Sequence, residues 1–358
     1  MAKIISLFNH KGGVSKTTTT FNLGWILAEQ GKKVLIVDTD PQCNLTGVCL
    51  SLSGNDNFEI FYESKEVDNI RNVLLSVFEN QPIPLRPARC YKFPTRDNLY
   101  LLPGHIGFSE FDVSMGIAQE LTGTLKLAQN IPGAINHLLR VTAEKYEFDY
   151  ILIDMSPSVS ATNANLLMQS DYFVVPCSPD YFCNMAINSL SQVIPEWFRT
   201  YENLRTHPVF KDAVYKLPNT TPKFIGTILQ RYRPRNGSPA QSFQQWITRI
   251  NNNVGENLVP VLKQYGMIVE DEKFEKVLRN NKSDSTQSSL DKTYNIINIG
   301  DFNSLIAQSQ KYNVPVFALS STQMEQVGNI LKNMEKARED FHSTFIQLAN
   351  NIQILTEE

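Results

Sequence analysis

A glycine- and lysine-rich segment near the N-terminus carries the residue types that hold phosphate groups. Its sequence, over residues 11–18, is KGGVSKTT. Glycines let backbone N–H groups approach a phosphate, a lysine supplies a mobile positive charge, and a threonine hydroxyl can bind Mg²⁺. The usual signature, G-x-x-x-x-G-K-[ST], has glycine at two positions where this chain has His10 and Ser15. Because Lys16 and Thr17 remain, the segment predicts a nucleotide-phosphate site of an unusual kind.

Acidic residues stand at the ends of two hydrophobic stretches that have the composition of buried strands. Asp154 ends the run YILID, and Asp38 and Asp40 follow the run VLIV. Transfer of a phosphoryl group to water needs a metal ion, charge neutralisation and an oriented water molecule. Carboxylates at the carboxyl ends of parallel strands lie on the ligand side of the sheet. We therefore expect Asp154 to hold Mg²⁺ through a water, and Asp38 either to lie near the metal or to cap its own loop.

The elements that must position these residues alternate between strands and helices. Ile4–Asn9 is typical of a buried strand, Lys16–Gln30 of a helix and Val34–Val37 of a second strand, and together they make a βαβ unit. The expected fold is therefore α/β, a doubly wound, mostly parallel sheet flanked by helices. Helices are expected near 109–128 and 133–145, and further strands at Leu99–Leu102, Tyr150–Asp154, Tyr172–Pro176, Phe224–Gln230 and Val314–Leu319.

Two regions depart from this alternation. Residues 51–97 begin like a loop, contain an expected helix at Val67–Phe78 and then hold four prolines, so we expect an insertion beside the sheet. From Met324 to Leu355, apolar residues recur at three- and four-residue spacing, which predicts a long amphipathic helix. That helix could pack on its own sheet or form a surface for a dimer or a partner, and both alternatives stay open.

The phosphate segment resembles the deviant Walker A motif, K-G-G-x-x-K-[ST], of the ParA/MinD family of P-loop ATPases. The likeness to the ParA branch extends through Asn22-Leu-Gly24 and through the run Asp38-Thr-Asp-Pro-Gln42. Ser15 departs from the glycine that is usual in the family, and it requires a loop conformation that a serine can adopt. The resemblance is dense over 1–47, returns at 150–158 and 171–182, and is faint at 222–235 and 311–320.

The resemblance implies an ATP-dependent homodimer with ATP and Mg²⁺ as its cofactors. In the family, the lysine at the position of Lys11 reaches across the dimer to the partner's nucleotide, and the aspartate at the position of Asp40 orients the attacking water. Met155–Ser158 would sense the γ-phosphate, although it lacks the Pro-Pro pair usual in relatives. The catalytic residues would be Lys11, Lys16 and Asp40, and the metal site would use Thr17, Asp154 and Asp38.

Nucleotide binding is expected to involve the whole phosphate segment and one contact to the base. For the base, Gln230 at a strand end and the loop Pro176–Asp180 are candidates, and a solvated loop is an equal alternative for each. We assign residues 1–320 to a ParA-like P-loop ATPase domain with the insertion 51–97, and residues 321–358 to the long C-terminal helix. The nucleotide-binding residues would be Lys11, Gly12, Gly13, Val14, Ser15, Lys16, Thr17, Thr18 and Gln230.

The composition excludes several classes of protein. With 33 Lys and Arg against 36 Asp and Glu, the net charge of −3 argues against a chain coated by nucleic acid. No apolar run approaches the roughly 18 residues of a membrane helix, so we expect no membrane partner and a cytoplasmic location. The five cysteines have no metal-binding spacing and form no pair suited to a shared iron–sulfur cluster.

Although the net charge of the whole chain is slightly negative, one stretch of it is basic. Residues 222–282 hold ten basic and five acidic side chains, a net charge of +5. ParA relatives bind DNA non-specifically as ATP-bound dimers through basic residues, and contacts to phosphates carry no sequence code. A solvated surface is the open alternative. The candidates for DNA binding are Arg231, Arg233 and Arg235 beyond a strand end, and Lys273, Lys276 and Arg279 on an expected helix.

These features lead to the hypothesis of an ATP-driven dimerisation switch of ParA type. It would hydrolyse ATP slowly and act in the partition or positioning of a plasmid, a chromosome or another cargo, with a ParB-like or other partner protein. The alternative is an ATPase sensor or regulatory subunit of a larger complex, such as a defence assembly, built on the insertion and the C-terminal helix. A metabolic ligase on the same fold is a third hypothesis, for which the sequence indicates no substrate pocket.

Overall fold

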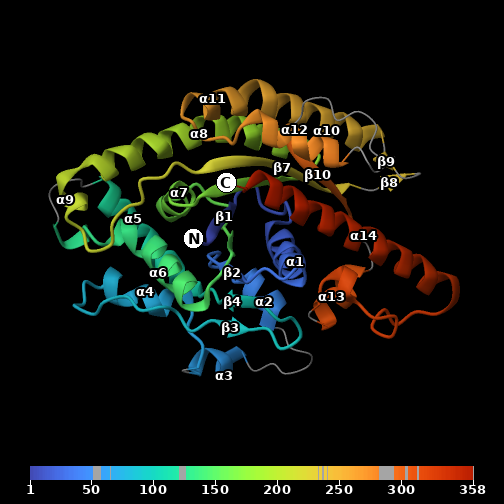
Figure 1. Cartoon of the computed structure of the whole chain (residues 1–358), viewed down its shortest axis with the longest axis horizontal. Coiled ribbons are helices and arrows are strands. Elements are labelled where there is room, and N and C mark those ends of the chain that lie inside the picture. Colours follow the sequence, from blue (N-terminus) through green and yellow to red (C-terminus); the bar gives the residue numbers. More distant parts are fainter. Residues whose placement is uncertain are drawn as a thin grey trace.

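The computed structural model describes residues 1–357 apart from 51–57, 65, 121–125, 233, 236–237, 240, 282–293, 303–304 and 313. The strands of this part are β1 (Lys3–Leu7), β2 (Val34–Asp38), β3 (Tyr91–Lys92), β4 (Leu99–Leu102), β5 (Tyr150–Asp154), β6 (Tyr172–Cys177), β7 (Lys223–Tyr232), β8 (Pro234–Arg235), β9 (Ser238–Pro239) and β10 (Asn295–Gly300). Eight of them form one sheet in the order β10-β7-β6-β1-β5-β2-β4-β3, and β8 pairs with β9 separately (Figure 1).

The helices follow the strands along the chain. They are α1 (Lys16–Glu29), α2 (Asn44–Leu50), α3 (Phe58–Glu63), α4 (Ile70–Phe78), α5 (Glu110–Glu120), α6 (Ile131–Tyr146), α7 (Ala161–Met168), α8 (Tyr181–Thr206), α9 (Pro208–Lys211), α10 (Gln241–Asn253), α11 (Val259–Gln264), α12 (Asp271–Asn281), α13 (Leu305–Tyr312) and α14 (Gly328–Leu355). Neighbouring strands of the eight-stranded sheet run parallel except β3 and β4. The expected doubly wound, mostly parallel sheet flanked by helices is confirmed.

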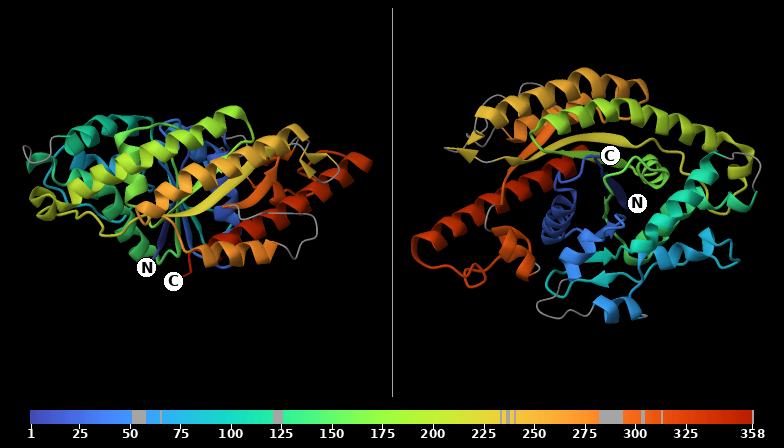
Figure 2. Two further views of the ribbon diagram at one scale, coloured as in Figure 1. Left: turned by 90° about the horizontal axis from the view of Figure 1, so that it is seen from above. Right: turned by 180° about the vertical axis from the view of Figure 1, so that it is seen from behind.

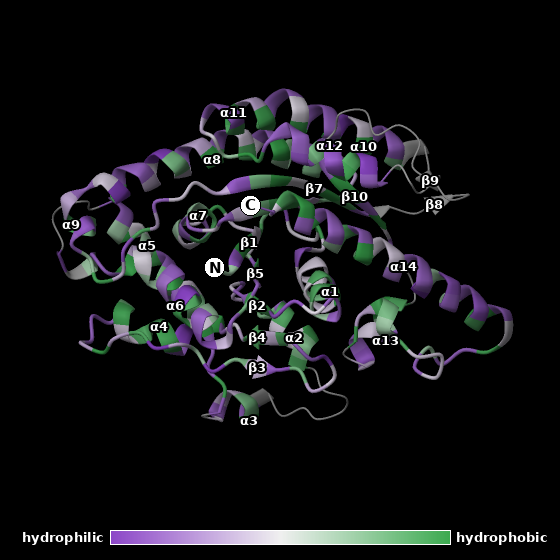
Figure 3. Ribbon diagram, in the orientation of Figure 1, coloured by the Kyte–Doolittle hydropathy of each residue, from purple (hydrophilic) through white to green (hydrophobic). Residues whose placement is uncertain are grey.

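Each face of the sheet has its own hydrophobic core. Ile4 packs into the core shared with α5, α6, α7 and α8, and its neighbour Ile5 packs into the opposite core, shared with α1, α12 and α14. This alternation follows from the two-residue period of a strand. Because both faces are covered, the central strands are continuous hydrophobic runs. In β7, Figure 3 shows a hydrophilic start followed by a hydrophobic stretch.

The register of the central strands brings the candidate residues together. β5 lies between β1 and β2, with Asp154 opposite Leu7 on one side and opposite Asp38 on the other. The loop that follows β1 and the acidic ends of β2 and β5 therefore share one edge of the sheet. In doubly wound sheets, ligands bind at this carboxyl edge, where neighbouring connections leave in opposite directions.

The region 51–97, which the sequence analysis assigns to an insertion, adds one strand to the sheet. Its described part contains α3, α4 and the two-residue strand β3, which pairs antiparallel with β4 at the sheet edge. Helix α4 begins at Ile70 because Asn69 caps it, accepting a hydrogen bond from the Asn72 N–H. Ile70 and Leu74 are then fully buried in the core beside α6.

The prediction of a strand at Val314–Leu319 is wrong. Only a short 3-10 turn, Val316–Ala318, forms there, and the outermost parallel strand is β10 instead. Pro315 has no N–H for a sheet ladder, and Val316 and Phe317 are buried against α14 rather than in the sheet. The sequence analysis missed strand β10 because asparagines interrupt its isoleucines in the run NIINIG, which therefore does not read as a hydrophobic stretch.

The expected C-terminal amphipathic helix is present as α14. Its C-terminal half packs on its own chain, against α1, α12 and β10, with Phe345, Leu348 and Ile352 fully buried. Its N-terminal half extends away from the sheet, as Figures 1 and 2 show, and Ile330 is exposed there. Among the described residues, no helix combines the length and the apolar character needed to cross a membrane.

Candidate functional site

The loop between β1 and α1 has the backbone shape that a phosphate-binding loop requires. Gly13 and Ser15 both have positive φ angles, 73° and 59°. The left-handed conformation of Ser15 is the one glycine adopts most easily, and a serine there costs about 1 kcal/mol or more. The Ser15 carbonyl accepts hydrogen bonds from the Thr19 N–H (2.9 Å) and hydroxyl (2.8 Å), which hold the turn. A serine in the left-handed conformation therefore stands at the position where relatives usually have glycine.

Lys16 lies at the start of α1, almost fully buried, with its ammonium group over the loop. Its Nζ donates to the Asn9 carbonyl at 3.0 Å. Burial lowers the pKa of Lys16, and the carboxylates of Asp154 and Asp40 oppose that shift. A buried ammonium group at a helix N-terminus attracts an anion, because the helix dipole and its first N–H groups are also positive there.

Thr17 and Asp154 form the second part of the site. The Thr17 hydroxyl donates to Asp154 Oδ2 at 2.7 Å, while the buried Oδ1 of Asp154 has no hydrogen-bond partner. Burial, together with the nearby Asp38 carboxylate, raises the pKa of Asp154 to about 8. This hydroxyl and unpartnered carboxylate oxygen fit Mg²⁺, which prefers oxygen ligands and keeps several waters. The described residues contain no cluster of three His, Cys, Asp or Glu side chains for a metal, so phosphate oxygens and water would complete this one.

Asp38 is fully buried, and its carboxylate accepts hydrogen bonds from the loop that follows it. Its Oδ2 accepts the Thr46 N–H at 2.8 Å and the Thr46 hydroxyl at 2.7 Å, and its Oδ1 accepts the Asp40 N–H at 3.2 Å. Burial raises the pKa of Asp38 to about 6, although these hydrogen bonds favour the ionised form. This is the geometry of the loop-capping alternative, and it fixes the backbone that carries Asp40.

Asp40 lies near both parts of the site. It is mostly buried, its Oδ1 accepts the Gln42 N–H at 2.9 Å, and its charge acts on the pKa values of Lys16 and Asp154. A carboxylate in this place could accept a hydrogen bond from a water molecule beside a bound phosphate.

Lys11 is held by an ion pair within its own chain. Its Nζ lies 2.6 Å from Asp180 Oδ2, and both side chains are partly exposed. Asp180 also caps α8, because its Oδ1 accepts the Cys183 N–H at 2.9 Å. The sequence analysis considered Asp180 only as part of a loop near the base, and a separation of 169 residues gave no signal of this pair.

Two buried amides that the sequence analysis did not single out support the site. Asn9 donates from Nδ2 to the Pro176 carbonyl at 2.9 Å and accepts the Lys11 N–H at 2.9 Å, which joins the phosphate loop to β6. Asn163, in the first turn of α7, donates to the carbonyls of Ser156 (3.0 Å) and Ser158 (2.8 Å). It thereby holds the segment that follows Asp154.

Gln230 supports the loop from behind rather than lying at an open surface. Its side chain is buried, and its Nε2 donates to the Thr19 hydroxyl at 2.5 Å. Since Thr19 in turn bonds the Ser15 carbonyl, Gln230 ties β7 to the turn of the phosphate loop. This position argues against a direct contact between Gln230 and a nucleotide base.

The basic candidates for DNA binding are only partly described. Arg233 and the side chains of Arg231 and Arg235 lie outside the described residues. On α12, Lys273 bonds the Glu357 carbonyl, Arg279 lies 3.3 Å from Glu275, and Lys276 is exposed. The outer face of α12 also carries Asp271, Glu272 and Glu275, so it is mixed in charge rather than basic.

Comparisons with known proteins place the chain among relatives. A family model described as an AAA domain matches residues 2–205, more than half of the chain. The sporulation initiation inhibitor protein Soj of Bacillus subtilis is 32% identical over 197 residues, which cover 54% of this chain and 64% of Soj. The chromosome partitioning protein ParA of Caulobacter vibrioides is 24% identical over 259 residues, covering 72% of this chain and 80% of ParA.

The fold has relatives among solved structures. A complex of a McdA variant from Cyanothece with ATP matches with a TM-score of 0.53 at 18% identity, over 94% of this chain and 96% of McdA. At this identity the likeness concerns the fold. Together with the variant phosphate loop and the family match, it identifies the lineage: the chain belongs to the ParA/MinD-like family of P-loop ATPases.

Proposed function

We propose that the chain binds ATP with Mg²⁺ at the carboxyl edge of the sheet and hydrolyses it slowly as a dimer-coupled switch. The observation that carries the proposal is the convergence of Lys16, the Thr17–Asp154 pair and Asp40 beside a loop shaped for phosphate. The unpartnered Oδ1 of Asp154 adds a place for a cation. The ATP bound to McdA supports the same ligand here.

The residues have distinct tasks in this proposal. Lys16 and the first N–H groups of α1 neutralise the phosphate oxygens, and Thr17 and Asp154 hold the cation. Mg²⁺, when bound, supplies further neutralisation of the charge on the phosphates. Asp40 orients the attacking water, while Asp38 and Thr46 keep its loop in place. Asn163 holds the segment Met155–Ser158, so loss of the γ-phosphate can be transmitted to α7.

The dimer would form across the face that carries the phosphate loop. Several large apolar side chains are exposed on the elements that begin at this edge, among them Phe182 (67% exposed) in α8, Val113 (68%) in α5 and Val159 between β5 and α7. Exposed apolar groups that gather around one site are typical of an interaction surface. Lys11, once released from Asp180, could reach a nucleotide in the other subunit.

The biological role we propose is partition or positioning of DNA or another cargo. The names of Soj and of the chromosome partitioning protein ParA support it, as does the family as a whole. A ParB-like or other partner protein would stimulate hydrolysis. The alternative of a sensor in a larger complex needs free partner surfaces, and the candidates are the N-terminal half of α14 and the exposed Ile60 and Ile83 of the region 51–97.

The test of the switch is Asp40→Ala. We expect this variant to bind ATP like the native protein, to lose turnover by about 100-fold or more, and to accumulate as a dimer with MgATP. Sedimentation velocity with and without ATP measures the dimer. If the variant stayed monomeric with ATP while the native protein turned over normally, the dimer-coupled switch would be wrong.

The test of DNA binding is an ATP-dependent mobility shift on random-sequence DNA across a salt series. Replacing Arg231, Arg233 and Arg235 together by alanine should reduce the slope of log K against log salt by up to about 3, roughly 0.9 for each phosphate that is no longer neutralised. Lys276→Ala, on the mixed-charge face of α12, is the matched control and should change little. Binding that ignored both ATP and salt would argue against the DNA role.

A further inference from the structure

The phosphate loop ends in a serine whose backbone conformation is uncommon for its type. Ser15 has φ 59° and ψ 30°, in the left-handed region, and its side chain makes no capping hydrogen bond to α1. Glycine adopts this region without strain, whereas an L side chain crowds the backbone there. Alternation of left- and right-handed residues turns successive backbone N–H groups to one side, where they can surround an anion. If Ser15 relaxed, the peptide planes on both sides of it would rotate and this arrangement would be lost.

A chain of two side-chain hydrogen bonds reaches Ser15 from the interior of the protein. The Ser15 carbonyl accepts the Thr19 hydroxyl at 2.8 Å, besides the Thr19 N–H at 2.9 Å. The same hydroxyl oxygen accepts a hydrogen bond from Gln230 Nε2 at 2.5 Å. Because Gln230 donates to this oxygen, the hydroxyl hydrogen is directed at the Ser15 carbonyl.

Both members of this chain are shielded from solvent. Thr19 is fully buried and Gln230 is 1% exposed, so water does not compete for either bond. Consecutive hydrogen bonds in such surroundings strengthen one another. Gln230 is also fixed by the sheet, since β7 pairs with β6 on one side and with β10 on the other. The turn at Ser15 is therefore held from a rigid strand.

We propose that Gln230 and Thr19 are positioning residues that hold Ser15 left-handed, in compensation for the glycine usual at this position, and thereby set the affinity for a triphosphate. The first half of the proposal concerns the conformation of the loop alone. The second half rests on the proposed function, since it needs phosphates to bind in this loop. A loop that has the binding conformation for only a fraction of the time binds more weakly by that fraction.

The conformation is tested without nucleotide, by NMR of the full chain labelled with ¹³C-serine. The Cα and Cβ shifts of Ser15 report its backbone conformation, and the signal lost in Ser15→Gly assigns them. We expect left-handed shifts in the native protein, and a movement away from them in both Thr19→Val and Gln230→Leu. Ser15 signals that stay unchanged in both variants would overturn the positioning role.

Thr142→Val is the matched control for Thr19→Val. The Thr142 hydroxyl, in α6, also donates to the carbonyl four residues earlier, that of Leu138, at 2.7 Å. It also accepts a second donor, the Ala88 N–H at 3.0 Å, and it is fully buried. Loss of this hydroxyl should leave the Ser15 signals as they are in the native protein. A movement of equal size in this control would mean that the shifts report general destabilisation, which would also overturn the positioning role.

The effect on affinity is tested by calorimetric titration with MgATP in two backgrounds. Gln230→Leu should weaken binding about fivefold in the native background, equivalent to about 1 kcal/mol. In the Ser15→Gly background the same change should cost less than about twofold, because glycine keeps the left-handed turn unaided. A fivefold loss in both backgrounds would overturn the compensation, since a glutamine that only supports the core does not depend on residue 15.

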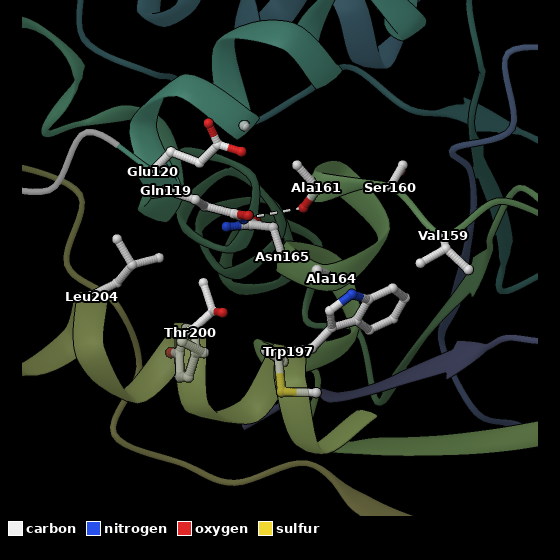
Figure 4. Close-up of a pocket in the computed structure, with 13 residues that line it drawn as sticks. Gln119, Glu120, Val159, Ser160, Ala161, Ala164, Asn165, Trp197, Thr200 and Leu204 are labelled. Carbon is white, nitrogen blue, oxygen red and sulfur yellow. Dashed lines mark hydrogen bonds between the residues drawn. The ribbon is translucent and has the colours of Figure 1, made fainter. Parts of the chain in front are cut away.

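Gln119→Leu is the control for removal of a glutamine that joins two elements. Its Nε2, on α5, donates to the Ala161 carbonyl at the start of α7 at 3.1 Å, as the dashed line in Figure 4 shows. We expect this variant to bind MgATP like the native protein in both backgrounds. A loss that Ser15→Gly restores here too would overturn the specific role of Gln230.

Titration with inorganic tripolyphosphate and Mg²⁺ separates positioning of the loop from contact with the base. Positioning predicts that Gln230→Leu weakens tripolyphosphate and ATP by the same factor, whereas a base contact predicts a loss for ATP alone. The second result would overturn the proposal. A native protein that binds neither ATP nor tripolyphosphate would overturn the proposed function, while the Ser15 signals would still decide the positioning.

Discussion

The two lysines of the phosphate segment lie five residues apart and in opposite environments. Lys16 belongs to what we call the buried side, together with Thr17 and Asp154, where each side chain is fixed by hydrogen bonds inside the core. Lys11 belongs to the outer pair, a partly exposed ion pair with Asp180. The buried side can bind a nucleotide within one chain. The ion pair of the outer pair must break before Lys11 can reach the nucleotide of another subunit. The difference suggests that binding and dimerisation are separate steps, and three predictions test it.

The largest expected effect is the difference in ATP affinity between variants of the two lysines. Lys16→Ala should weaken ATP binding by about 100-fold, because it removes a charged donor that is already in place over the loop. Lys11→Ala should change ATP binding by the monomer less than about fivefold, since an exposed ion pair contributes little. Isothermal titration of both variants at a protein concentration below dimerisation measures the difference. Equal losses of ATP affinity in the two variants would contradict the proposed difference between Lys16 and Lys11.

The second prediction concerns the stability that the protein loses by burying the Asp154 carboxyl group. The pKa of Asp154 is about 8 in the folded chain, above its ordinary value, so the folded state keeps a proton that the unfolded state releases. Without nucleotide or Mg²⁺, the native protein should therefore lose stability as pH rises from about 4 to about 8. Asp154→Asn, which is always neutral, should escape this loss and be more stable than the native protein at pH 8 by a few kcal/mol.

Urea unfolding at pH 5 and at pH 8 measures that difference. The advantage of Asp154→Asn should be smaller at pH 5, where the native carboxyl group is already protonated in the folded chain. Asp149→Asn, which alters an exposed carboxylate bonded to the Lys33 N–H, is the matched control. A variant that is less stable than the native protein at pH 8 would contradict the account of Asp154.

The smallest expected effect concerns the outer pair. Asp180→Asn keeps an oxygen to cap α8 but removes the charge that holds Lys11. Release of Lys11 should strengthen the ATP-dependent dimer by about two- to fivefold, the range expected for one exposed ion pair. Sedimentation equilibrium with MgATP measures the dimer constant, and Lys11→Ala should cancel the gain. A weaker dimer in Asp180→Asn would mean that Asp180 itself contacts the other subunit.

The sequence predicted the buried side better than the outer pair, for physical reasons. The positions of Lys16, Thr17 and Asp154 follow from local motifs at the ends of strands, and the parallel register brings such ends together. The bond between Thr46 and Asp38 depends on where α2 begins, which no motif specifies. The pair of Lys11 with Asp180 and the bond from Gln230 to Thr19 join segments more than 160 residues apart.

The same distinction applies to the fold. The central strands were predicted because burial on both faces gives them unbroken hydrophobic runs. Strand β10, at the edge, mixes asparagine with isoleucine, and its place could be found only from its pairing with β7. Val316 and Phe317 have the same apolar character as a strand, but they pack under a helix.

The short strand β3 has a consequence for how copies of the protein can meet. An open sheet edge offers unpaired N–H and C=O groups on which another chain can add a strand and aggregate. Here the edge ends in two residues running antiparallel to the rest, and Lys92 is exposed on it beside Asp97. Short edge strands and charged side chains both discourage such pairing. A protein proposed to pair and separate repeatedly through its nucleotide face is thereby protected from joining irreversibly through this edge of its sheet.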